Sequence, residues 1–86
     1  MSGYNGWRNY ETWNVALWLD NDEGTYNDVR ELAEEHDSPY ELGRVIEEYV
    51  EEFTPDLGAS MFSDLLNAAL SEVDWHAIAA NVLEES

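Results

Sequence analysis

Residues 38–53 read SPYELGRVIEEYVEEF and carry the clearest helix signal in the chain. Ser38 can cap the helix, and Glu41 places an acid in the first turn. Pro39 suits the first helical position, because an amide N–H there would have no hydrogen-bond partner within the helix. At 100° per residue the apolar side chains share an arc of about 140°. These side chains are Leu42, Val45, Ile46, Tyr49, Val50 and Phe53. The pattern predicts an amphipathic helix with one face in a core.

Two helices are predicted on the N-terminal side of this segment. The first runs from Tyr10 to about Asp20, with Asn9 as its N-cap. The second starts at residues 25–28, which read TYND and resemble a capping box, with Thr25 as the cap and Asp28 as its reciprocal acid. Its apolar side consists of Tyr26, Val29, Leu32 and Ala33.

Two more helices are predicted on the C-terminal side. Thr54 and Pro55 end the central helix and can cap the next one, over residues 56–71. Asp74 caps the last helix, and Val73 can pack on Ile78 as a hydrophobic staple. No segment alternates with the period of a strand. We therefore expect an all-α fold, a compact single domain of four to five short helices over residues 1–86, in which residues 1–9 form an N-terminal aromatic arm.

The composition is strongly acidic. The 86 residues include 20 Asp and Glu against three Arg and no Lys, for a formal net charge of -17, yet 44% are apolar and 13% aromatic. Enough apolar surface is present for a folded core. Direct binding of nucleic acid or of an anionic membrane is not expected, because both need clustered cations. The longest apolar run, residues 15–19, is far too short to span a bilayer.

Neither catalysis nor cofactor binding is expected. Cys is absent, His36 and His76 are 40 residues apart, and Ser60, Ser63 and Ser71 lie in no recognisable nucleophile motif. The absence of Cys also excludes disulfides, and residues 1–6 lack the pattern of a secretion signal. We therefore expect a non-enzymatic protein in the cytoplasm, that of the host cell if a phage encodes it.

A calcium loop is the weaker alternative for the acidic segment from Asp20 to Glu31. Such a loop needs Gly at its sixth position, where this chain has Thr25, and an oxygen ligand at the fifth, where it has Gly24. The pattern fails at both positions, so no metal site is predicted. Gly24 is interpreted instead as a helix-ending or turn glycine.

The acidic side chains form rows on two predicted helices. Five carboxylates occupy about 18 Å of helix between Glu41 and Glu52, close to the spacing of about 3.4 Å between charges along one DNA strand. The helix before it adds a second row. We take as candidate partner-binding residues Glu31, Glu34, Glu35, Glu41, Glu47, Glu48, Glu51 and Glu52. Adaptation to high salt is the alternative explanation of the acidity, since mutual repulsion costs stability that either salt or a cationic partner would relieve.

Aromatic residues are concentrated near the N-terminus. Five of the eleven aromatics lie in the first 18 residues: Tyr4, Trp7, Tyr10, Trp13 and Trp18. The helix from Tyr10 is apolar nearly all round, so it is either central in the core, with Trp7 and Trp13 as packing anchors, or in contact with another molecule. The candidate aromatic interface consists of Trp7, Trp13 and Trp18.

Residues 4–21 read YNGWRNYETWNVALWLDN. This segment resembles the opening of small acidic proteins of phages, plasmids and salt-loving archaea that share an Asn-Tyr-Glu-Thr-Trp motif. Residues 73–75 with Ile78 and Ala79 are similar to the closing helix of the same group. The group has no settled biochemical function, so the resemblance implies a mobile-element setting and assigns no role to any residue.

These observations favour an acidic nucleic-acid-mimic inhibitor of a host defence nuclease complex, an anti-CRISPR or anti-restriction protein that binds a basic DNA- or RNA-binding groove. This target class comes by analogy with small acidic proteins of mobile elements, and the charge pattern requires only complementarity to a basic groove. The alternative is a non-enzymatic oligomeric accessory protein, for example a homodimer, with an aromatic interaction helix and a salt-adapted acidic surface.

Overall fold

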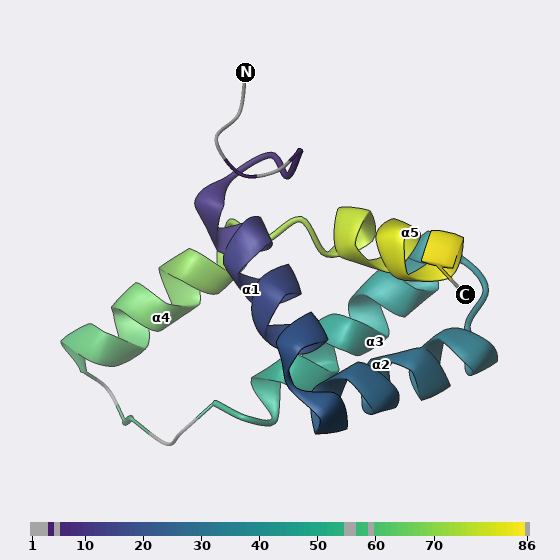
Figure 1. Ribbon diagram of the computed structural model, residues 1–86. Coiled ribbons are helices and arrows are strands. Elements are labelled where there is room, and N and C mark those ends of the chain that lie inside the picture. Colours follow the sequence, from purple (N-terminus) through teal and green to yellow (C-terminus); the bar gives the residue numbers. More distant parts are fainter. Residues whose placement is uncertain (1–3, 5, 55–56, 59, 86) are drawn as a thin grey trace.

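The computed structural model describes Tyr4, residues 6–54, residues 57–58 and residues 60–85, and Figure 1 shows their arrangement. Within this part of the chain all regular structure is helical, which confirms the all-α class. The helices are α1 (Tyr10–Asn21), α2 (Glu23–Glu35), α3 (Pro39–Glu51), α4 (Met61–Ser71) and α5 (Trp75–Glu85). None of the described helices is long and apolar enough to cross a membrane.

Two predicted helix starts are confirmed in detail. The Asn9 side-chain oxygen accepts a hydrogen bond from the Thr12 amide at 2.9 Å, and the Asp74 carboxylate accepts from the Ala77 amide at 3.1 Å. Each bond satisfies an amide that the first helical turn leaves without a partner. The Asn9 amide group also donates to the Glu72 carbonyl at 2.7 Å, which ties the start of α1 to the segment before α5.

The predicted start of α2 is wrong by three residues. Asp22 is the cap, and its carboxylate accepts from the Thr25 amide at 3.1 Å. The Thr25 hydroxyl donates to the Leu19 carbonyl at 3.0 Å, so it satisfies the end of α1. Aspartate caps a helix as well as threonine does, and the shorter connection carries α1 directly into α2. Gly24 consequently lies inside α2, which corrects its interpretation as a turn glycine.

The predicted start of α4 is also wrong. The helix begins at Met61, and the Ser60 hydroxyl accepts from the Ser63 amide at 3.2 Å, so Ser60 replaces Thr54 as the cap. Gly58 has a φ of +64°, a left-handed conformation that no helical turn contains. The part of this prediction that concerns residues 55–56 lies outside the described residues. Ser38 occupies the cap position of α3 as predicted, although its side chain makes no capping hydrogen bond.

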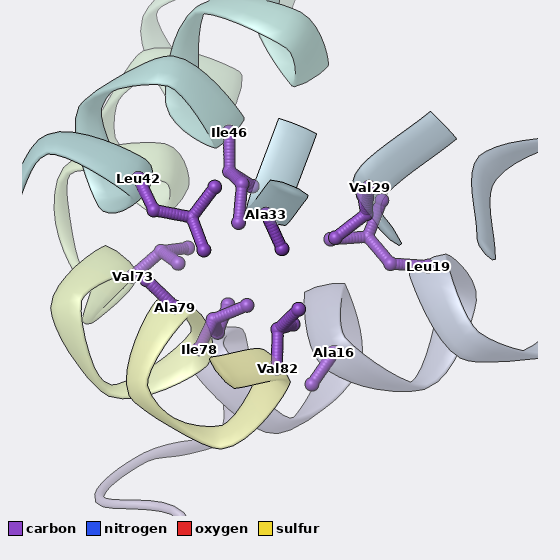
Figure 2. Packing of buried hydrophobic residues seen from close by; sticks show 10 residues of the cluster. All are labelled: Ala16, Leu19, Val29, Ala33, Leu42, Ile46, Val73, Ile78, Ala79 and Val82. Carbon is purple, nitrogen blue, oxygen red and sulfur yellow. The ribbon is translucent and has the colours of Figure 1, made fainter. Parts of the chain in front are cut away.

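The core lies between α3 and α5 and is closed by α1 and α2. In Figure 2, Leu42 and Ile46 of α3 point toward Ile78 and Val82 of α5. The buried cluster consists of Ala16, Leu19, Val29, Ala33, Leu42, Ile46, Val73, Ile78, Ala79 and Val82. Helices α3 and α5 make the most extensive contact because Gly43 lets the α5 backbone approach closely. Thr12 is also fully buried, and its hydroxyl accepts from the Asp74 amide at 2.8 Å.

Helix α4 adds no buried residue to this core. It lies to one side of the other four helices in Figure 1. The side chains of Met61, Phe62 and Leu65 are each more than 60% exposed. Phe53, assigned by periodicity to the buried face of α3, is 61% exposed because the helix ends before it, at Glu51.

Candidate protein-interaction surface

The candidate acidic residues of α3 lie on two flanks of the helix. At 100° per residue, Glu41, Glu48 and Glu52 form one row, and Glu47 and Glu51 lie about 60–140° away. The first row faces the end of α2, because Glu41 and Glu48 share an open hollow of about 300 Å³ with His36, Arg44 and Val45. Glu47 and Glu51 line a different hollow, of about 500 Å³, together with Leu70 and Ser71 of α4.

The acids of α2 divide in the same way. The Tyr49 hydroxyl donates to the Asp28 carboxylate at 2.6 Å, which places Asp28 on the flank of α2 that faces α3. Glu35 lies about 20° from Asp28 around the helix and Glu31 about 60°, whereas Glu34 lies about 120° away, near Arg30. On these angles we group Asp28, Glu31, Glu35, Glu41, Glu48 and Glu52 as one acidic face. Of the eight candidate residues, Glu34, Glu47 and Glu51 lie outside this acidic face.

Arg44 lines the same hollow as Glu41 and Glu48, but no ion pair of the described residues involves the acidic face. Within the described residues the ion pairs join Arg8 to Asp74 at 3.7 Å and Arg30 to Glu85 at 2.7 Å, and neither involves an acid of this face. The six carboxylate side chains belong to exposed residues. The acidic face therefore presents fixed negative charge to the solvent, where a cationic surface can reach it.

Several carboxylates lie near the Tyr49 hydroxyl at one end of this face. The pKa of this hydroxyl is raised well above the ordinary value by desolvation, by the hydrogen bond to Asp28, and by the negative charges of Asp28, Asp22 and Glu52. Ionising Tyr49 there would add a charge beside three carboxylates. The tyrosine therefore remains a neutral donor at ordinary pH and holds α2 against α3.

The three candidate aromatic residues have different environments. Trp7 is half-buried and packs on the core, and Trp13 is half-buried and lies 5.6 Å from Tyr10 between ring centroids. Trp18 is 67% exposed. Only Trp18 of the three therefore presents most of its surface to another molecule. Phe53 is an exposed neighbour of this region that periodicity assigned to the buried face of its helix; its position directly before Thr54 and Pro55, which were predicted to end that helix, was the available signal.

The acidic segment from Asp20 to Glu31 is largely helical. Asp22 caps α2, and residues 23–31 lie within that helix, so the segment does not form a calcium-type loop. A group of three or more His, Asp or Glu residues arranged to hold a metal ion is absent from the residues that the structure describes.

Asp20, in the last turn of α1, is expected to destabilise the fold at neutral pH. Burial raises its pKa, the negative charge of Glu85 raises it further, and Arg30 opposes both effects. A raised pKa means that the folded state binds the proton more tightly than the unfolded state, so the penalty exists at neutral pH and disappears as the pH falls toward 3.8. Asp20→Asn should raise Tm by about 2–4 °C at pH 7, the effect of removing a carboxylate from a helix C-terminus.

Thermal melts followed by circular dichroism at pH 7 and pH 3 test this prediction. Glu31→Gln removes a charge from the exposed middle of α2 and controls for the general relief of repulsion. The charge of Asp20 is not the cause of the penalty if Asp20→Asn raises Tm no more than the control does, or if its gain in Tm is the same at both pH values.

Comparison with known proteins gives one positive result. A family model described as a family of unknown function (DUF7249) matches residues 1–85. No curated protein and no solved structure matches the chain. The family description assigns no activity to any residue.

Proposed function

The chain belongs to this family of unknown function, and we propose that it is a non-enzymatic inhibitor that occupies the nucleic-acid-binding groove of a basic partner protein. The observation that carries the proposal is the acidic face of α2 and α3, whose exposed carboxylates have no ion-pair partner within the described part of the chain. With a net charge of -17, the whole molecule reinforces this face electrostatically.

The charge density of the acidic face can be compared with that of nucleic acid. Between Glu41 and Glu52 the face has three carboxylates of α3, where one DNA strand carries about five charges, and α2 contributes three more. The helices are already folded, so binding in a groove of Arg and Lys requires no ordering of the backbone, although each Glu side chain that is immobilised loses rotamer freedom. Long-range attraction accelerates the encounter, and added salt slows it.

A nuclease of a host defence system, of the CRISPR or restriction type, is the partner class within this proposal. The resemblance of residues 4–21 to small acidic proteins of mobile elements supports that class. Such nucleases hold DNA or guide RNA in a basic channel, and a protein with this acidic face would compete for the channel.

Matched charge reversals test the role of the acidic face. Changing Glu41, Glu48 and Glu52 to Lys alters the net charge from -17 to -11, because each of three reversals adds two units. Changing Glu34, Glu47 and Glu51 to Lys has the same effect on net charge but leaves the acidic face intact. The first triple variant should weaken competition with DNA by about tenfold or more, and the second by much less.

The readout is fluorescence anisotropy of a labelled DNA duplex bound to a nuclease captured from host extract on the immobilised chain at low salt. Circular dichroism must show that both triple variants keep their helices. Equal losses of competition in the two variants would mean that only net charge matters. Full competition by the first variant would refute the role of the acidic face in binding.

The exposed apolar residues favour a second candidate, an oligomeric accessory protein. Trp18 is 67% exposed, and Met61, Phe62 and Leu65 of α4 are exposed to a similar extent. Apolar side chains in this arrangement are typical of contacts between chains. Sedimentation over a range of protein and salt concentrations distinguishes the candidates, since self-association that does not depend on salt, without binding to a basic nuclease, favours the accessory protein.

A further inference from the structure

A small apolar pocket lies where the C-terminal halves of α1 and α3 meet the start of α2. Its volume is about 240 Å³, below the range of about 300–1,000 Å³ usual for small-molecule sites and suited to a single large side chain. Its lining includes Val15, Trp18, Leu19, Val50, Phe53 and Asp22. The pocket is thus apolar inside and has a carboxylate in its wall.

Two aromatic rings form the exposed wall of this pocket. Trp18 is 67% exposed and Phe53 is 61% exposed, so a bound partner could bury much of the surface that each ring now presents to water. The Phe53 ring packs edge-on against Tyr49, with 5.0 Å between centroids, which holds it in place before any partner arrives. Exposed aromatic side chains around a preformed hollow are typical of the few positions that dominate binding energy at protein interfaces.

Negative charge lies beside the same pocket. Asp22 lines it, Glu52 precedes Phe53 in the chain, and Asp28 accepts the hydrogen bond from Tyr49, the ring on which Phe53 packs. The ion pairs of the described residues use none of these three carboxylates. An apolar hollow with an acidic edge is complementary to an apolar side chain flanked by Lys or Arg.

We infer that this aromatic pocket receives a large apolar side chain from a basic segment of the partner protein, and so anchors the partner beside the acidic face. The inference rests on the proposed function only in taking the partner to be a cationic protein. A second copy of this chain is a poorer occupant, because it brings a net charge of -17 and only three Arg to an acidic edge. Charge gives long-range attraction, and the pocket adds a short-range preference among basic partners.

Two Lys-rich helical peptides of equal length and charge are the probes. One carries Trp at its central position and the other carries Ala there. Binding of fluorescently labelled peptides at low salt should favour the Trp peptide by about tenfold, the effect expected of one buried anchor. Phe53→Ala should remove this preference without weakening binding of the Ala peptide, and Trp18→Ala should do the same.

Phe62→Ala is the matched control, because Phe62 is 63% exposed on α4 and outside the pocket. It should leave the preference for the Trp peptide unchanged. Glu52→Gln should weaken both peptides by the same factor, since it removes charge but no apolar wall.

The possible failures are distinct. If both peptides bind equally well to the native chain, or if Phe53→Ala keeps the preference, the pocket is not an anchor site although the proposed function survives. If neither peptide binds at low salt, the cationic-partner proposal itself fails. A native dimer that Phe53→Ala dissociates would show that a second copy fills the pocket, and would overturn the inference.

Discussion

Replacing Ile46 with alanine should destabilise the protein by about 2–5 kcal/mol, the usual cost of removing a large buried aliphatic side chain. Ile46 is fully buried and points from α3 toward the apolar residues of α5 (Figure 2). The loss combines the transfer free energy of the missing carbons with the cavity left behind, which the flanking helices can only partly close. A domain of this size has a free energy of unfolding of about 4–13 kcal/mol, so the variant should lose a substantial part of its stability.

Urea unfolding followed by circular dichroism measures this loss. Val45→Ala is the matched control, since Val45 is the preceding residue of α3 and is only half-buried. Its cost should be about 1 kcal/mol. A loss below about 1 kcal/mol for Ile46→Ala would contradict the central position of this side chain.

Replacing Gly43 with valine should cost about 2–3 kcal/mol, because the space beside this glycine is filled by backbone. A Cβ atom at position 43 would lie 3.1 Å from the carbonyl oxygen of Trp75 and 3.3 Å from the amide nitrogen of His76. Valine adds two further methyl groups, and neither helix can yield without opening the contact between α3 and α5. The strain should therefore appear as a lower urea midpoint with unchanged helical content at low urea.

Two comparisons separate packing from helix propensity. Gly43→Ala should lie within about 1 kcal/mol of the native protein, because its gain in helix propensity offsets the small displacement it requires. Gly24→Val, in the first turn of α2, meets only the capping Asp22 carboxylate at 3.1 Å, so its cost should not exceed that of losing this capping bond, about 0.5–2 kcal/mol. If Gly43→Val is tolerated as well as Gly24→Val, the close approach of α5 is not required for stability.

The acidic candidates show how far helix periodicity can predict a surface. Spacing places the eight glutamates outside the apolar arc of each helix, and all of them except the half-buried Glu47 are exposed. It does not say which flank of α3 meets α2. Glu48 and Glu51 are equivalent in the sequence pattern, yet one lines the hollow shared with His36 and the other the hollow beside α4.

The aromatic pocket was beyond prediction for a related reason. Trp18 and Phe53 are 35 residues apart; Trp18 was a candidate interface residue, whereas periodicity placed Phe53 on the buried face of its helix. Their exposure depends on where α1 and α3 end relative to each other, which no local pattern contains. Thr12 is the converse case: a polar residue that becomes fully buried because its hydroxyl accepts a hydrogen bond from the start of α5.

The amino-acid sequence by itself determined the helical class, the caps at Asn9 and Asp74, the inner face of α3 apart from Phe53, and the large negative charge. These properties follow from composition and from interactions within one or two helical turns. The tertiary structure alone decided that α4 contributes no buried residue, that the acidic rows divide between flanks, and that Trp18 and Phe53 share a pocket. An apolar face favours burial, but which surface covers it depends on how all the helices pack together, because burial is non-directional and any partner of suitable shape can provide it.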